Sequence, residues 1–412
     1  MTWLTEIIEQ HSELESPESF WRWSALAAIS AVVKDNIWFD KHLYKLYPNI
    51  YVMLHADSGL KKGPPISMAS QLVSHVNNTN IIIGRSSIQG ILKDMSTNKT
   101  TPGGTIINNS KAFICSSELT SSLIEDRVAT TILTDLYDRQ WRVNEWKSLL
   151  KMEVFTLKDP IITMLGGTNE AHSEEFFVKQ DLYGGFFGRT FIIHESERLN
   201  TNSLMFPLKH KIDYKQSAEY LKEVAKLRGE FIVSDETRKF MDDWYIQFKA
   251  IIDQSEVKDN TGTLNRFDDS VLKVAMLISL AKEPKLELGI DSIEEAIVQC
   301  SKLLGNVRKA TARKGKSIWT QEIALIIEEL IEREPHMITR TQLNRKYMMH
   351  ASDVEWDGIM KSLETGGVIR IEAMGSNIVY VMSDNEVMKW KEHFAGKMAN
   401  DESKSKRKRK EK

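Results

Sequence analysis

Short apolar runs alternate with helical patterns between residues 48 and 198, and this alternation most limits the folds open to the chain. The apolar runs cover residues 50–54, 81–84, 111–117, 160–167 and 189–195. Helical patterns such as SSIQGILKDMS and SSLIEDRVATTILTDLYD separate several of them. Apolar strands alternating with helices predict an α/β fold with a mostly parallel sheet covered on both faces. Ligands of such sheets bind beyond the carboxyl ends of the strands, so the residues that follow each strand are the candidates for a binding site.

The segments on either side of this region have other patterns. Residues 1–47 are predicted to be helical, with Ser16 as a helix cap and Pro17 in the first turn. Long helical patterns after residue 205 predict a helical domain. Three helices followed by a two-stranded ribbon, with Gly375 at its tip, predict a winged-helix domain near the C-terminus. The predicted segments are therefore 1–47 (helical), 48–204 (α/β core), 205–312 (helical), 313–384 (winged helix) and 385–412 (C-terminal helix and basic disordered tail).

Length and cysteine content limit the class of protein. At 412 residues the chain can build two or three domains, each with its own core. Its two cysteines, Cys115 and Cys300, lie far apart in apolar segments, which argues against a disulfide framework and against a cysteine zinc site. This usage predicts a reducing, intracellular setting. We expect no membrane span and no signal peptide, because no apolar run reaches about 18 residues.

Basic residues gather at the C-terminus, although the formal net charge of the chain is only -2. The last ten residues, SKSKRKRKEK, hold seven Lys or Arg against one Glu. This tail is a candidate contact for the phosphate backbone of DNA, a solubilising end, or a nuclear import signal. The candidate nucleic-acid contacts are Arg370 in the ribbon and Lys406, Arg407, Lys408, Arg409 and Lys410 in the tail. The helix SDVEWDGIMKSLETGG has mixed charge, which favours protein contacts over base reading.

The turn after the first predicted strand, ADSGLKKGPP, has the layout of a phosphate-binding loop. Such a loop needs small residues that let backbone N–H groups point inward, a lysine for the phosphates and a hydroxyl for Mg²⁺. With Lys62 as that lysine, Lys61 stands at the second glycine of the GxxxxGK[ST] pattern and Gly63 at the hydroxyl position. The alternative is an ordinary basic turn. The candidate nucleotide-binding residues are Ser58, Gly59, Leu60, Lys61, Lys62 and Gly63.

Polar residues also stand at the ends of three later strands. The third strand ends at Ser117 and Glu118, where ring ATPases carry Asp-Glu, although such an acid is also a common helix cap. The fourth strand ends at Asn169, where a γ-phosphate sensor would lie. The fifth begins at Arg189, in the position of an arginine finger.

Together these segments resemble the RecA-like P-loop ATPases of phages, prophages and plasmids that accompany or fuse to primases. The resemblance is carried by ESPESFWRWSALAAIS, VMLHADSGLKKGP, RSSIQGIL, FICSSEL, LTDLYDRQW, PIITMLGGTNE and GGFFGRTFI. It implies that ATP and Mg²⁺ are bound, that Lys62 contacts phosphates and that Glu118 is the catalytic carboxylate. It also implies Asn169 as the sensor and Arg189 as a finger that reaches a neighbouring subunit in a ring.

The resemblance further implies that single- or double-stranded DNA and a separate primase are partners, in the cytoplasm of a bacterial host. The chain departs from the family at the metal contacts. Gly63 and Pro64 offer no hydroxyl and Ser117 replaces an aspartate, which leaves Ser58, Ser67, Ser117 and Glu118 as candidate substitutes. Two hypotheses follow: a ring-forming, helicase-like DNA motor, or a catalytically degenerate initiator, helicase loader or scaffold.

Overall fold

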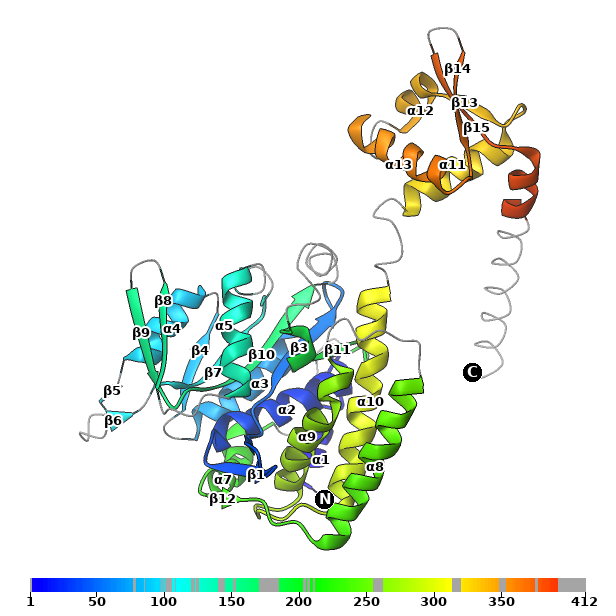
Figure 1. Ribbon diagram of the computed structural model, residues 1–412. Coiled ribbons are helices and arrows are strands. Elements are labelled where there is room, and N and C mark those ends of the chain that lie inside the picture. The colour runs from blue at the N-terminus through cyan, green and yellow to red at the C-terminus, as the bar shows by residue number, and fades with distance from the viewer. Residues whose placement is uncertain are drawn as a thin grey trace. The chain divides into compact units, whose positions relative to one another are not determined.

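The computed structural model forms two compact units, residues 1–311 and 312–412 (Figure 1). It describes residues 2–391 except for short segments. These are 77–78, 85, 98, 101–105, 108, 120–122, 124–125, 140–144, 151–152, 170–184, 203–204, 206–207, 210–211, 255–261, 313–319, 348–352 and 375–376. Each unit has its own buried core.

A five-stranded, all-parallel sheet forms the centre of the first unit. Its spatial order is β11-β3-β10-β7-β4, so the first strand in sequence lies between the last two. The bounds are β3 (Tyr51–Ala56), β4 (Asn80–Ile83), β7 (Lys111–Ser116), β10 (Ile161–Asn169) and β11 (Thr190–His194). The α/β class, the parallel sheet and all five strands predicted from the sequence are confirmed.

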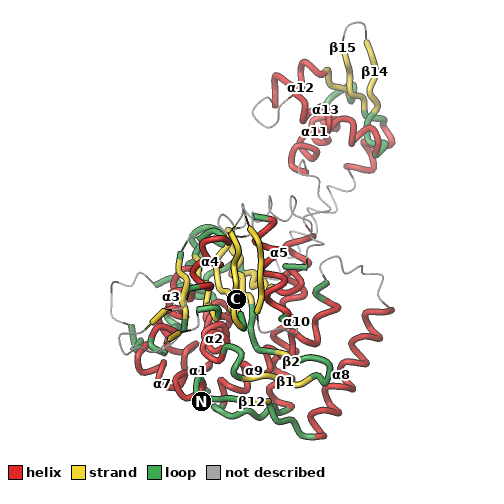
Figure 2. Tube along the Cα trace, turned by 60° about the vertical axis from the view of Figure 1, so that its left-hand side comes forward, coloured by secondary structure: helices red, strands yellow, loops and turns green. Residues whose placement is uncertain are grey.

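Helices cover both faces of this sheet (Figure 2). Alternate residues of β3 enter two different cores: Val52 and Leu54 pack on one side, and Tyr51 and Met53 on the other. The first core is closed by α1 (Trp3–Gln10), α2 (Glu18–Val33), α3 (Gly63–Ser74), α7 (Tyr214–Val224), α9 (Phe267–Lys282) and α10 (Ile290–Ala312). The second is closed by α4 (Ile88–Ser96), α5 (Arg127–Asp138) and the hairpin β8 (Glu145–Leu150)–β9 (Glu153–Lys158).

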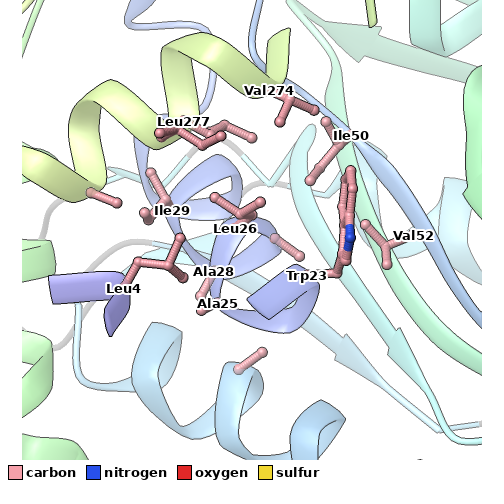
Figure 3. Packing of buried hydrophobic residues seen from close by; sticks show 14 of the residues in the cluster. Leu4, Trp23, Ala25, Leu26, Ala28, Ile29, Ile50, Val52, Val274 and Leu277 are labelled. Carbon is pink, nitrogen blue, oxygen red and sulfur yellow. The ribbon is translucent and has the colours of Figure 1, made fainter. Parts of the chain in front are cut away.

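Helix α2 lies at the centre of the first core (Figure 3). It is apolar on nearly all sides, as expected of a helix with no solvent face. Trp23 lies beside Ile50 and Val52, and its ring is 5.0 Å from that of Phe191. The N-terminal segment, the sheet and the later helices therefore share one core within residues 1–311.

The sequence analysis did not predict several strands outside the central sheet. These are β1 (Ile37–Asp40), β2 (Lys45–Leu46), β12 (Gly229–Glu230), β5 (Lys99–Thr100), β6 (Ile106–Ile107) and the longer β8 and β9. Pairs such as β5–β6 are only two residues long and therefore have no readable alternation. The long helix α8 (Asp235–Gln254) follows β12 and precedes α9 and α10.

The second unit combines helices with a small antiparallel sheet. The order along the chain is α11 (Thr320–Glu332), β13 (Met337–Thr339), α12 (Arg340–Tyr347), α13 (Asp353–Thr365), β14 (Arg370–Met374) and β15 (Asn377–Val381). Trp356 is fully buried among its apolar residues. Gly375, the predicted tip of the ribbon, lies outside the described residues. Among the described helices of the whole chain, none is long and apolar enough to cross a membrane.

Candidate functional site

The loop between β3 and α3 has an unusual backbone. Gly59 has φ +90° and Lys61 has φ +51°, which is the left-handed region that side chains rarely adopt. Lys61 thus takes a conformation suited to the glycine that the phosphate-loop pattern has at this position. Leu60 is buried in the core and anchors the middle of the loop. The loop therefore bends sharply at Gly59 and Lys61, although Lys61 is not the glycine of the pattern.

Lys62 folds back over the loop. Its Nζ donates to the carbonyls of Ala56 at 2.7 Å and Asp57 at 3.0 Å. Burial lowers the pKa of Lys62, whereas Glu118 and Asp57 act in the opposite direction and raise it. A phosphate placed at the loop would offer Nζ stronger acceptors than two neutral carbonyls. The ammonium group of Lys62 is thus held at the open side of the loop, where phosphate oxygens could replace the two carbonyls as its acceptors.

The ends of β7 and β10 meet beside Lys62. A Cβ added at Gly167 would lie 2.6 Å from the carbonyl oxygen of Ser117 and 3.6 Å from Cβ of Lys62. The N–H of Leu119 donates to the carbonyl of Gly167 at 2.9 Å. This hydrogen bond holds the segment that follows β7 against the end of β10. Ser117 and Lys62 thus lie on either side of Gly167, and the charge of the next residue, Glu118, is near enough to raise the pKa of Lys62.

Asn169 reaches the same edge from β10. It pairs with Ala56, the last residue of β3, so it stands level with the start of the loop. Its neighbour Thr168 is buried, whereas Asn169 is half-buried. The predicted sensor position is therefore beside the predicted phosphate loop.

Three residues at this edge, Ser16, Glu15 and Arg198, were not among the site residues predicted from the sequence. The hydroxyl of Ser16 donates to the carbonyl of Lys61 at 2.7 Å, so Ser16 fastens the loop. The prediction that Ser16 caps the following helix was wrong, since Pro17 is the N-cap residue and makes no side-chain cap. Glu15 lies 3.9 Å from Nζ of Lys61 and 3.4 Å from Nη1 of Arg198. A single sequence gave no signal for these contacts, because they join segments that lie far apart along the chain.

Arg189 does not join this group. It precedes β11, and Thr190 pairs with Tyr51, the first residue of β3. Arg189 therefore stands at the amino edge of the sheet, roughly 20 Å along the strands from the loop. Its side chain is 8% exposed and bonds to Asp138 and to the carbonyl of Gly185. A role as a finger toward a neighbouring subunit stays a prediction, and Arg189 would have to leave Asp138 to perform it.

The residues at the loop do not fit the expected Mg²⁺ site. The helix begins with Gly63, Pro64 and Pro65, so no hydroxyl follows Lys62 and two backbone N–H groups are missing. Ser67, one turn later, accepts a hydrogen bond from Gln71. Ser117 stands where the aspartate is expected, and the described residues contain no group of three or more His, Cys, Asp or Glu that could hold a metal. The chemistry of this edge is therefore best understood from its cations and from the carboxylate of Glu118, the residue that follows Ser117.

The predicted nucleic-acid residues divide into two groups. Arg370 begins β14 and is exposed. The tail residues lie outside the described residues: Lys406, Arg407, Lys408, Arg409 and Lys410.

Comparison of the chain with protein-family models and with curated proteins finds no match to either. Functional inference therefore rests on the geometry of the site.

Proposed function

We propose that residues 1–311 contain a RecA-like P-loop core that binds ATP at the loop of residues 57–62. One observation carries this proposal: Lys62, Glu118 and Asn169 come from three different strand ends and meet at one edge of a parallel sheet. The backbone of the loop, with positive φ at Gly59 and Lys61, supports it further.

The strand order points to the same place. In open parallel sheets, ligands bind beyond the carboxyl ends where neighbouring strands send their connections in different directions. Strand β3 lies between β10 and β11, while the chain that leaves β3 continues to β4 at the edge of the sheet. The loop after β3 is therefore at the expected switch point.

The proposed biological role is that of a helicase-like protein in the replication of a phage or another mobile element. This role includes a homo-oligomeric ring, DNA as the substrate track and a separate primase as a partner in a bacterial cytoplasm. It rests on the resemblance of the loop and strand-end motifs to phage and plasmid ATPases, on the convergence of Lys62 and Glu118, and on the position of Asn169.

A second candidate is a catalytically degenerate initiator, loader or scaffold that keeps the nucleotide fold. The poor fit to Mg²⁺ and the engagement of Arg189 by Asp138 favour it. Loss of one group from a phosphoryl-transfer site commonly lowers the rate by on the order of 10³. Under this candidate, nucleotide controls assembly and is hydrolysed slowly or not at all.

We propose a winged-helix domain for the second unit, on the order helix-strand-helix-helix-strand-strand. The outward residues of α13 include Asp357, Lys361 and Glu364, a mixed set that suits a protein partner better than base reading. Arg370 and the basic tail supply non-specific attraction to DNA.

The test compares wild-type protein with Lys62→Ala and Glu118→Gln. ATP binding and hydrolysis are measured with and without single-stranded DNA, while light scattering reports the oligomer size. DNA-stimulated hydrolysis that both variants lose supports the motor. Binding that Lys62→Ala loses, without hydrolysis in any protein, supports the second candidate. If wild-type protein binds no ATP under any condition, the proposal is wrong.

A further inference from the structure

The mouth of the loop carries three cations from two distant parts of the chain. Lys61 and Lys62 belong to the loop itself, and Arg198 follows β11. A Cβ placed on Gly59 would lie 4.0 Å from Nη2 of Arg198, so the guanidinium stands directly beside the bend of the loop.

Glu15 holds two of these cations in place. Its carboxylate lies 3.9 Å from Nζ of Lys61 and 3.4 Å from Nη1 of Arg198, and it is 17% exposed. The side chains of Lys61 and Arg198 remain 53% and 48% exposed. The acid is therefore shielded beneath the two cations, which keep much of their surface open to a ligand.

The same loop lacks the two side chains that ordinarily contact the metal ion in a phosphate loop. The residue after Lys62 has no side chain, the next two are prolines, and Ser117 replaces the expected aspartate. In ordinary phosphate loops the metal neutralises part of the charge between the β- and γ-phosphates. A loop without these two contacts can take the same positive charge from cationic side chains.

We propose that this site binds the polyphosphate of a nucleotide without Mg²⁺, with Lys61 and Arg198 supplying the charge that the metal supplies elsewhere. Lys62 contacts the phosphates from within the loop, and Glu15 is a positioning residue that keeps Lys61 and Arg198 at its mouth. This inference rests on the proposed function, because it assumes that the loop binds nucleotide. The ligand it specifies is the metal-free nucleotide tri- or diphosphate.

A substitution at Lys61 can remove the charge without changing the backbone of the loop. Because its φ of +51° suits glycine, Lys61→Gly removes the charge while it preserves the bend of the loop. Arg198→Ala removes the second cation. A matched control is Arg340→Ala, since Arg340 is a partly exposed arginine that pairs with Asp357 in the other unit.

The experiment measures ATP binding to the full chain by calorimetry, once with Mg²⁺ and once with EDTA. We expect wild-type protein to bind ATP in EDTA with a Kd within about threefold of its Kd in Mg²⁺, a difference below about 1 kcal/mol. In EDTA, Lys61→Gly and Arg198→Ala should each weaken binding about tenfold or more, as expected for loss of a charge-assisted contact. Arg340→Ala should bind as wild type does.

Two results would overturn the inference while the proposed function stands. One is ATP binding by wild-type protein that disappears in EDTA. The other is wild-type affinity in both Lys61→Gly and Arg198→Ala, with binding lost only in Lys62→Ala. Absence of ATP binding by wild-type protein in both conditions would contradict the proposed function and, with it, this inference.

Discussion

Arg189 and Asp138 form a largely buried ion pair at the amino edge of the sheet. Nε of Arg189 donates to Oδ1 of Asp138 at 2.9 Å, and Nη1 donates to the carbonyl of Gly185 at 2.8 Å. The pair joins the end of α5 to the start of β11. Its position indicates a structural role within one subunit.

Removal of either partner should therefore destabilise the protein. Arg189→Ala and Asp138→Ala each leave one charge buried without its counterion, which costs about 3 to 5 kcal/mol. Thermal or urea unfolding of the first unit measures this loss. The paired change Arg189→Met with Asp138→Leu should cost less than the sum of the two single changes. A stable Arg189→Ala protein that loses only oligomer-dependent hydrolysis would instead identify Arg189 as a finger.

Lys273 should make the stability of the first unit depend on pH. Its Nζ is buried, donates to both oxygens of Asn49 and lies 3.9 Å from the centre of the Tyr137 ring. Burial lowers the pKa of Lys273 to about 7, against the opposing pull of Asp269 and Asp138. Between about pH 7 and the usual lysine pKa, the unfolded chain binds a proton that the folded chain does not. The free energy of unfolding should therefore rise with pH, by up to about 1.4 kcal/mol per pH unit.

The measurement is urea unfolding at several values between about pH 7 and pH 9, the window in which the two states differ in protonation. Lys273→Met should flatten the slope, whatever it does to the stability at a single pH. Lys302→Met, at an exposed lysine of α10, is the control and should keep the wild-type slope. Equal slopes in wild type and Lys273→Met would contradict the prediction.

The apolar runs sufficed to predict the sheet, because strands buried on both faces are almost wholly apolar and differ clearly from the helices between them. The positions of Lys62, Glu118 and Asn169 followed from the rule that ligands lie at the carboxyl ends of strands. Arg189 could not be placed in the same way. It precedes its strand, and only the structure reveals its ion pair with Asp138, a residue 51 positions earlier in the chain.

Long-range contacts explain the remaining misses. Ser16 has the residue type of a helix cap and lies just before a helix, yet its hydroxyl bonds to Lys61, 45 residues later. Glu15 and Arg198 are separated by 183 residues and meet only because α2, which follows Glu15, packs against β11, which precedes Arg198. No local pattern encodes such a contact.

Gly166 should tolerate no side chain. A Cβ there would lie 2.3 Å from Cγ of Leu119 and 2.6 Å from the carbonyl of Ser116, so Gly166→Ala must push the chain after β7 away from β10. We expect a loss of about 2 kcal/mol or more and weaker nucleotide binding, because Glu118 moves with that chain. Unfolding and ATP titration measure the two effects. Gly90→Ala in α4 is the matched control: its Cβ would meet only Ser87 Oγ, at 3.5 Å, and a helical alanine should be neutral or stabilising.

The basic tail should dominate the attraction to DNA. Removal of residues 404–412 deletes seven Lys or Arg, whereas Arg370→Ala removes one. For single-stranded DNA each lost phosphate contact lowers the slope of log affinity against log salt by about 0.7. Truncation should therefore weaken binding and flatten this slope far more than Arg370→Ala, equally for unrelated sequences, because α13 presents mixed charge. Fluorescence anisotropy of labelled oligonucleotides at several salt concentrations provides the measurement. An unchanged slope after truncation would place the DNA contacts elsewhere, in the α/β unit or on α13 itself.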